Sequence, residues 1–135
     1  MKVVLDTNAL QKINVFQSVC SANVLDCVEN DDAMFFIVKG NDGQKLYSAK
    51  NMGGIRRMEN MFRKRIRIYE FSSDPKIFAK RLIPEASDVE IENGIAKIKV
   101  KNCFKPKVIG KDKKNLAVIQ SLFKSFFDIE DVKIV

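Results

Sequence analysis

The sequence predicts an α+β protein in which two similar halves of about 65 residues follow one another. Segments with the periodicity of helices and of strands alternate along the chain, and one order of elements, αββααβ, occurs twice. A basic, glycine-containing loop is expected at the same place in each half, before the last helix. With 135 residues, the chain can form one ordinary domain or two very small ones.

Apolar periodicity and turn residues define the elements of the first half. Apolar side chains at three- and four-residue spacing predict a helix at about residues 8–21, and the apolar run at 33–39 predicts a central strand. The other elements predicted here are a strand at 23–28, a short segment at 44–49, a glycine loop at 50–54, a helix at 55–62 and a strand at 65–71.

The second half opens with a strong helix-start signal. Asp74 is a typical N-cap and Pro75 suits the first helical position, so a helix is predicted to about Ile83. Its inward residues are expected to be Ile77, Phe78, Leu82 and Ile83. The later elements are predicted as strands at 88–92 and 95–100 around an Asn93-Gly94 hairpin turn, a short helical turn before Gly110, a helix at 115–127 and a strand at 132–135.

Positive charge is concentrated in two blocks of the chain. The formal net charge is +7, yet residues 45–81 hold eleven basic and three acidic side chains, and residues 97–114 hold eight basic and one acidic. The stretches that flank these blocks are net acidic. Because a surface that serves only solubility mixes both signs, two such blocks favour a polyanionic partner, with nucleic acid as the first candidate.

The second block ends in a loop, residues 110–113, that we call the Gly110 loop. It is expected between a short helical turn and an amphipathic helix. The first N–H groups of a helix lack partners and attract phosphate, while glycine lets the backbone approach a ligand closely. The candidate binding residues here are Lys107, Gly110, Lys111, Asp112, Lys113, Lys114 and Asn115. The alternative is a solvated basic turn.

The glycine loop of the first half is a second candidate site. Its candidate binding residues are Lys45, Lys50, Asn51, Gly53, Gly54, Arg56 and Arg57. Tyr47, just before this loop, is a candidate for stacking on a base. The alternative is that the arginines belong to a solvated face of a helix and a strand.

Taken together, these features resemble tandem prokaryotic (type II) KH domains and, more narrowly, the small archaeal NusA-related transcription factors. The resemblance covers nearly the whole chain and rests on residues 10–27, 35–39, 56–73, 108–115 and 127–132. It implies one KH domain at 1–72, with a degenerate loop, and a second at 73–135. Since only Ser72-Ser73 joins the halves before the Asp74 cap, they are expected to pack as one rigid unit.

A KH domain holds about four single-stranded nucleotides with a G-x-x-G loop between two helices. The pattern falls on residues 110–113 in the second half, where Lys113 replaces the last glycine. In the first half it falls on residues 49–52, which contain no glycine, although Gly53-Gly54 follow directly. The resemblance therefore implies a clamp driven by charge more than by sequence selectivity.

The function implied is that of a non-enzymatic, RNA-binding transcription accessory factor in termination or antitermination. Two alternatives stay open: a ribosome-associated RNA-binding protein, and a KH-fold scaffold that binds proteins and no RNA. The expected partners are single-stranded RNA and either RNA polymerase or the ribosome. We expect a monomer. We also expect a cytoplasmic location without membrane contact, because no apolar run approaches the roughly 18 residues of a membrane span.

No cofactor, metal or catalytic residue is expected. The chain has no histidine, and its three cysteines (Cys20, Cys27 and Cys103) lack C-x-x-C spacing, so they are expected to be buried free thiols. Asp6, Asp26, Asp31 and Asp32 could be imagined as metal ligands, but the Asp31-Asp32 pair is more simply a hairpin tip.

Overall fold

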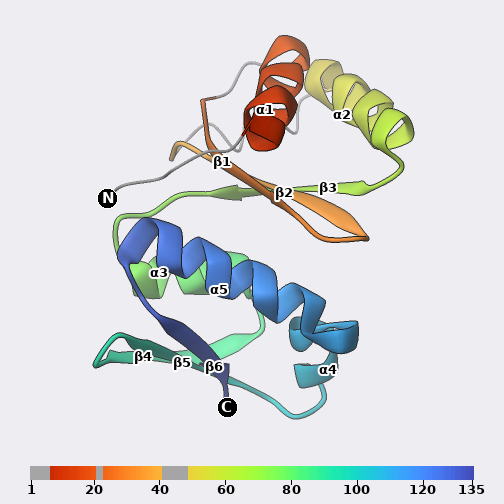
Figure 1. The fold of residues 1–135 in the computed structure, drawn as a ribbon. Coiled ribbons are helices and arrows are strands. Elements are labelled where there is room, and N and C mark those ends of the chain that lie inside the picture. Colours follow the sequence, from red (N-terminus) through yellow and green to blue (C-terminus); the bar gives the residue numbers. More distant parts are fainter. Residues whose placement is uncertain (1–6, 21–22, 41–48) are drawn as a thin grey trace. The chain divides into compact units, whose positions relative to one another are not determined.

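The structure is a computed structural model that describes residues 7–20, 23–40 and 49–135. The chain divides into two compact units, which we call the N-terminal unit, within residues 4–71, and the C-terminal unit, within residues 72–135. In each unit, the two longest described helices lie on one face of a three-stranded sheet (Figure 1). The predicted α+β class is therefore confirmed. Among the described residues, no helix has the length and apolar character needed to span a membrane.

The N-terminal unit is built around its middle strand. Its elements are α1 (Thr7–Val19), β1 (Val24–Glu29), β2 (Ala33–Val38), α2 (Ala49–Phe62) and β3 (Arg65–Glu70). β2 pairs antiparallel with β1 and parallel with β3. All six residues of β2 are buried, as the wholly apolar run predicted. Phe16 of α1 stacks on Phe36 of β2 with ring centroids 4.3 Å apart, and this pair lies at the centre of the core.

The C-terminal unit repeats this sheet order. Its elements are α3 (Pro75–Leu82), β4 (Ala86–Glu92), β5 (Ile95–Val100), α4 (Lys105–Ile109), the 3₁₀ turn η2 (Lys111–Lys113), α5 (Lys114–Phe127) and β6 (Asp131–Ile134). The middle strand β5 is antiparallel to β4 and parallel to β6. α3 and α5 lie along one face of the sheet, and α4 lies beside the beginning of α5 (Figure 1).

The helix start predicted at Asp74 and Pro75 is confirmed in this unit. The Asp74 carboxylate accepts a hydrogen bond from the Lys76 N–H at 2.9 Å, and α3 begins at Pro75 as predicted. Phe78 is fully buried, and its ring lies 5.9 Å from Phe123 and 5.8 Å from Phe126, measured between centroids. These rings pack α3 against α5.

The structure corrects the glycine loop predicted at 50–54. These residues belong to α2, which begins at Ala49, and Gly53 and Gly54 both lie inside the helix. Glycine in a helix costs only about 1 kcal/mol relative to alanine, which the burial of Ile55 and Met58 in the core offsets. The segment predicted at 44–49 lies outside the described residues, apart from its last residue.

Two smaller predictions were also wrong. Ile77 was expected to point inward, but it is 46% exposed, because Phe78, Ala79 and Leu82 form the buried face of α3. Cys20 and Cys27 are buried as expected, whereas Cys103 is exposed in the turn that precedes α4.

Candidate nucleic-acid interface

The Gly110 loop begins where α4 ends. Gly110 has φ 77°, and its N–H donates to the Pro106 carbonyl at 2.9 Å. A Cβ at this position would lie 3.0 Å from the backbone nitrogen of Asn115 and equally close to two atoms of the Asn115 side chain. Glycine is therefore favoured here for two reasons: a side chain would be strained at this φ, and a Cβ would be tight against Asn115.

Two non-glycine residues of the loop also have left-handed backbones. Asp112 has φ 56° and Lys113 has φ 61°. The Lys113 N–H donates to the Gly110 carbonyl at 3.2 Å and closes the turn. Such conformations cost a non-glycine residue about 1 kcal/mol or more, although aspartate tolerates them better than lysine. The chain thus stores strain at the place where the sequence predicted a phosphate site.

The same turn leaves the start of α5 without a side-chain cap. Lys113 occupies the N-cap position, and its side chain makes no capping hydrogen bond. An ammonium group has donors only, so it cannot accept from the first N–H groups of the helix. The 14-residue helix therefore begins with a partial positive charge that its own cap residue does not neutralise.

The predicted cations of the loop differ in accessibility. Lys111 and Lys113 are exposed on either side of the exposed Asp112, and Lys114 is half-buried at the first position of α5. Two accessible ammonium groups thus flank the uncapped helix start. Such an arrangement suits an anion with at least two oxygens, for example a phosphodiester, which makes this turn the candidate phosphate site.

Lys107 and Asn115 have partners within the unit. The Lys107 ammonium lies 3.0 Å from a carboxylate oxygen of Glu85, but its side chain is 72% exposed, so the ion pair is weak. The Asn115 side-chain amide donates to the Lys107 carbonyl at 3.2 Å. Asn115 therefore ties the start of α5 to the end of α4 and fixes the shape of the Gly110 loop between them.

The candidate residues of the first half do not form a comparable loop. Lys45 and Tyr47 lie outside the described residues, and the same holds for the side chains of Lys50 and Asn51, whose backbone is helical. Gly53 is exposed within α2, and apart from its chain neighbours and the backbone of its own helix no atom lies within 4 Å of the place that a Cβ would take. No close backbone approach therefore requires glycine at this position.

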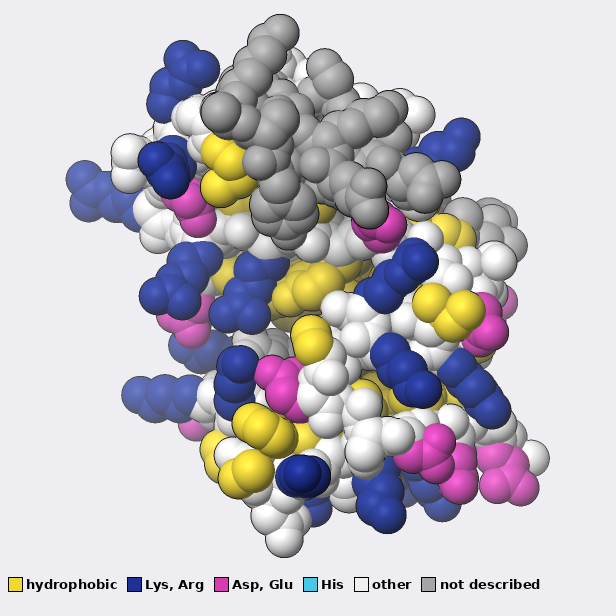
Figure 2. All heavy atoms as spheres, turned by 180° about the vertical axis from the view of Figure 1, so that it is seen from behind, with side chains coloured by type: hydrophobic (Ala, Val, Ile, Leu, Met, Phe, Trp, Pro, Cys, Tyr) yellow, Lys and Arg dark blue, Asp and Glu magenta, His cyan; other side chains and the backbone are white. Residues whose placement is uncertain are grey.

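Exposed arginines nevertheless make the N-terminal unit basic. Arg56 and Arg57 are exposed on α2, and Arg65 and Arg67 are exposed on β3. The Arg67 guanidinium lies 6.0 Å from the centroid of the Phe35 ring, at the outer limit of a cation–π contact. Figure 2 shows Lys and Arg side chains spread over the face that it displays, with acidic side chains among them.

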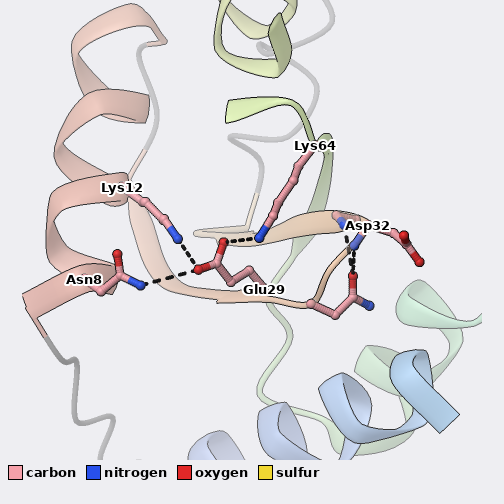
Figure 3. A network of polar contacts seen from close by, with 7 residues as sticks. Asn8, Lys12, Glu29, Asp32 and Lys64 are labelled. Atoms are coloured by element: carbon pink, nitrogen blue, oxygen red, sulfur yellow. Dashed lines mark hydrogen bonds and ion pairs between the residues drawn. The ribbon is translucent and has the colours of Figure 1, made fainter. Parts of the chain in front are cut away.

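Some basic side chains of this unit are structural. Glu29 of β1 accepts from Lys12 of α1 through one oxygen, and its other oxygen lies 2.9 Å from the Lys64 ammonium (Figure 3). Burial acts to raise the pKa of Glu29, but hydrogen bonds and charges from the two lysines outweigh it and hold this pKa below its ordinary value. Lys12 and Lys64 thus join α1 and the end of α2 to the sheet.

Of the acidic residues considered as metal ligands, Asp6 lies outside the described residues, and Asp26 and Asp32 have structural contacts. Asp26 is buried and accepts from the Cys27 N–H at 2.8 Å, and Asn30 accepts from the Asp32 and Ala33 N–H groups at the hairpin tip. Within residues 7–20, 23–40 and 49–135, no group of three or more acidic or cysteine side chains could hold a metal ion.

One exposed residue near the loop was missed by sequence reasoning. Phe104 precedes α4 and is 39% exposed, and it was not among the candidate binding residues. The available signal was its position in a lysine-rich segment directly before the predicted loop.

Comparisons with known proteins find relatives that match nearly the whole chain. No family model matches it. The chain is 30% identical to a probable transcription termination protein NusA of Methanocaldococcus jannaschii, over 99% of this chain and 76% of the relative. Proteins of the same name from Methanococcus vannielii and Thermoplasma acidophilum are 25% and 22% identical, over 100% and 98% of this chain and 81% and 96% of the relatives. The crystal structure of a protein called APE1850 superposes with a TM-score of 0.74 at 26% identity, covering 97% of this chain and 100% of that one.

The fold and the loop define a class of protein: two small α+β units, the second of which carries a strained basic turn between two helices. The relatives then identify the family. The chain belongs to the family of archaeal proteins named probable transcription termination protein NusA. The resemblance to archaeal NusA-related factors that the sequence indicated is thereby confirmed.

Proposed function

We propose that this protein is a transcription factor that binds single-stranded RNA through type II KH domains and acts in transcription termination or antitermination. The observation that carries the proposal is the Gly110 loop, where a strained glycine turn precedes an uncapped helix flanked by Lys111 and Lys113. Phosphodiester oxygens are the ligands that such a turn suits best. The names of the relatives support the role in transcription termination.

The order of elements supports the KH assignment. The C-terminal unit has the order αββααβ, with the Gly110 loop between its last two helices, where a KH domain holds the RNA backbone. The described N-terminal elements have the same sheet order, but helix α2 replaces the expected loop. We therefore assign the principal phosphate contacts to the C-terminal unit and a supporting basic surface to the N-terminal unit.

The proposal includes the partners and the setting. We propose KH domains at residues 1–72 and 73–135, acting as a cytoplasmic monomer on nascent single-stranded RNA with RNA polymerase as the protein partner. The Gly110 loop has one glycine in place of two, so we expect charge to supply most of its affinity and base sequence little.

Binding to single-stranded RNA at several salt concentrations tests the proposal. The wild-type protein should bind, and the logarithm of its affinity should fall by about 0.7 per log unit of salt for each phosphate neutralised. The double variant Lys111→Glu/Lys113→Glu should lose about tenfold in affinity at low salt and show a shallower slope.

A matched control keeps the total charge change the same. Lys97 and Lys133 are exposed, and they are register partners on the outer face of the C-terminal sheet. Their double reversal to glutamate should cost less than threefold in affinity, as expected from the net charge alone. If the wild-type protein binds no RNA at low salt, the scaffold alternative replaces this proposal.

A further inference from the structure

Phe104 is an aromatic side chain that the C-terminal unit leaves on its surface. It is 39% exposed, whereas every other phenylalanine whose burial the structure describes is buried or half-buried. Its ring has no aromatic partner within the described parts of the chain. A phenyl ring therefore presents apolar surface to water where a ligand could cover it.

The backbone holds Phe104 in place on both sides. Its N–H donates to the Lys101 carbonyl at 2.9 Å, and its carbonyl accepts from the Val108 N–H at 3.0 Å. The first bond closes the turn before α4, and the second belongs to the first turn of the helix. The exposed ring thus stands on a fixed backbone, so little conformational entropy would be lost when a ligand stacks on it.

The surroundings of the ring are basic and lie close to the Gly110 loop. Lys101 and Asn102 are exposed just before Phe104, and Lys105 follows it. The short helix α4 connects Phe104 directly to Gly110, so a helical rise of about 1.5 Å per residue brings the two within roughly 9 Å along the axis. A nucleic-acid strand held by its phosphates at the Gly110 loop can reach the ring.

We propose that the Phe104 ring is a stacking platform for a nucleobase of the RNA strand whose phosphates bind at the Gly110 loop. This inference rests on the proposed RNA-binding function and adds a base contact to it. Phenylalanine offers a π-face and no hydrogen-bonding group, so the platform accepts any base. It supplies affinity that does not depend on counterion release and is therefore insensitive to salt.

Three variants at this position separate stacking from simple apolar burial. Phe104→Leu keeps an apolar side chain without a π-face, Phe104→Tyr keeps the ring, and Phe104→Ala removes both. Affinity for single-stranded RNA should fall roughly five- to tenfold in the Leu and Ala variants and stay within twofold of wild type in the Tyr variant. The salt slope should remain unchanged in all three, in contrast to Lys111→Glu/Lys113→Glu.

A second measurement observes the base contact directly. The chain contains no tryptophan, so Phe104→Trp introduces a single fluorescent indole. Its emission should be quenched by single-stranded RNA, and an oligonucleotide of the same length with abasic sugars should leave it unchanged. The abasic strand should also bind wild type and the Leu variant with equal affinity, because only the phosphate contacts remain.

The outcomes distinguish this inference from the proposed function. If wild type binds RNA but the Leu variant binds equally well, or if RNA leaves the emission of the bound Trp variant unchanged, the platform is wrong and the phosphate site stands. If wild type binds no RNA at low salt, both are wrong. Loss of abasic-strand binding in the Leu variant would also contradict the platform, since it would show damage to the loop itself.

Discussion

The two units share a sheet order, but their glycines have opposite roles. Gly110 ends a helix with a left-handed backbone and lies against the start of the next helix, where a Cβ would lie only 3.0 Å from Asn115 atoms. Gly53 lies inside a helix, with no atom near the place of a Cβ. Only the first of these glycines shapes the loop to which we assign phosphate binding. The comparison indicates that a glycine in a basic segment predicts a candidate ligand-binding loop only where the backbone adopts a positive φ, which glycine alone adopts without strain.

The largest expected effect comes from replacing the glycine that the loop requires. Gly110→Ala should destabilise the protein by about 2–3 kcal/mol, because alanine is strained at this φ and its Cβ would press on Asn115. Denaturant unfolding would measure the change. A loss below about 0.5 kcal/mol would contradict the tight turn described above.

The matched substitution in the N-terminal unit should have the opposite sign. Gly53→Ala should stabilise the protein by about 0.5–1 kcal/mol, because alanine is the better helix former and its Cβ meets nothing. The same unfolding experiment applies. Destabilisation by Gly53→Ala would indicate that this segment is a loop after all.

The ion pairs of the two units differ in burial: Glu29 and its lysines are partly buried, whereas Lys107 is largely exposed. Glu29→Gln should lower stability at neutral pH by about 1 kcal/mol, since Glu29 joins two lysines in a partly buried site. The pKa of Glu29 is lowered in the folded state, so its contribution is present above the unfolded value of about 4.3 and is lost as pH falls through the folded pKa.

The control for this experiment lies in the C-terminal unit. Lys107→Met breaks the pair with Glu85, but the Lys107 side chain is largely exposed, so we expect a loss of stability of less than about 0.5 kcal/mol at neutral pH.

Stability curves of wild type and Glu29→Gln should converge as pH drops below about 4. A constant difference down to acidic pH would contradict the role given to the Glu29 carboxylate.

An effect of similar size to that of Gly53→Ala concerns strain within the Gly110 loop. Lys113→Gly should stabilise the turn by up to about 1 kcal/mol, because lysine pays for its left-handed backbone and glycine does not. It would also restore the second glycine of the G-x-x-G pattern while removing one cation. RNA affinity should therefore change by less than about threefold, with a shallower salt slope.

Local signals in the sequence predicted most of the fold. The Asp74 cap, the Asn93-Gly94 hairpin and the apolar run of β2 each act within a few residues, so they could be read directly. The helical state of Gly53 could not, because it depends on burial of the following residues in a core formed by distant segments. Lys12 and Lys64 meet Glu29 from 17 and 35 residues away, which no local pattern encodes.

The candidate site was predicted in outline. The short helix, the turn at Gly110 and the next helix follow from residue types, and so do the exposed lysines. The left-handed backbone of Lys113 was not expected, because lysine seldom adopts it and no local sequence signal indicates it. The exposure of Phe104 was missed because a helix of five residues is too short to show which face is buried.

The most direct test of the central claim counts the phosphates that each unit binds. The salt dependence of RNA affinity should be measured for wild type, for Lys111→Glu/Lys113→Glu and for Arg56→Glu/Arg57→Glu, which reverses two exposed charges on α2. The loop variant should lose roughly 0.7–1.4 units of the log–log slope, equivalent to one or two phosphates, and the α2 variant should lose less than half as much. An equal loss in both variants, or a larger one in the α2 variant, would contradict the claim that the Gly110 loop is the phosphate clamp.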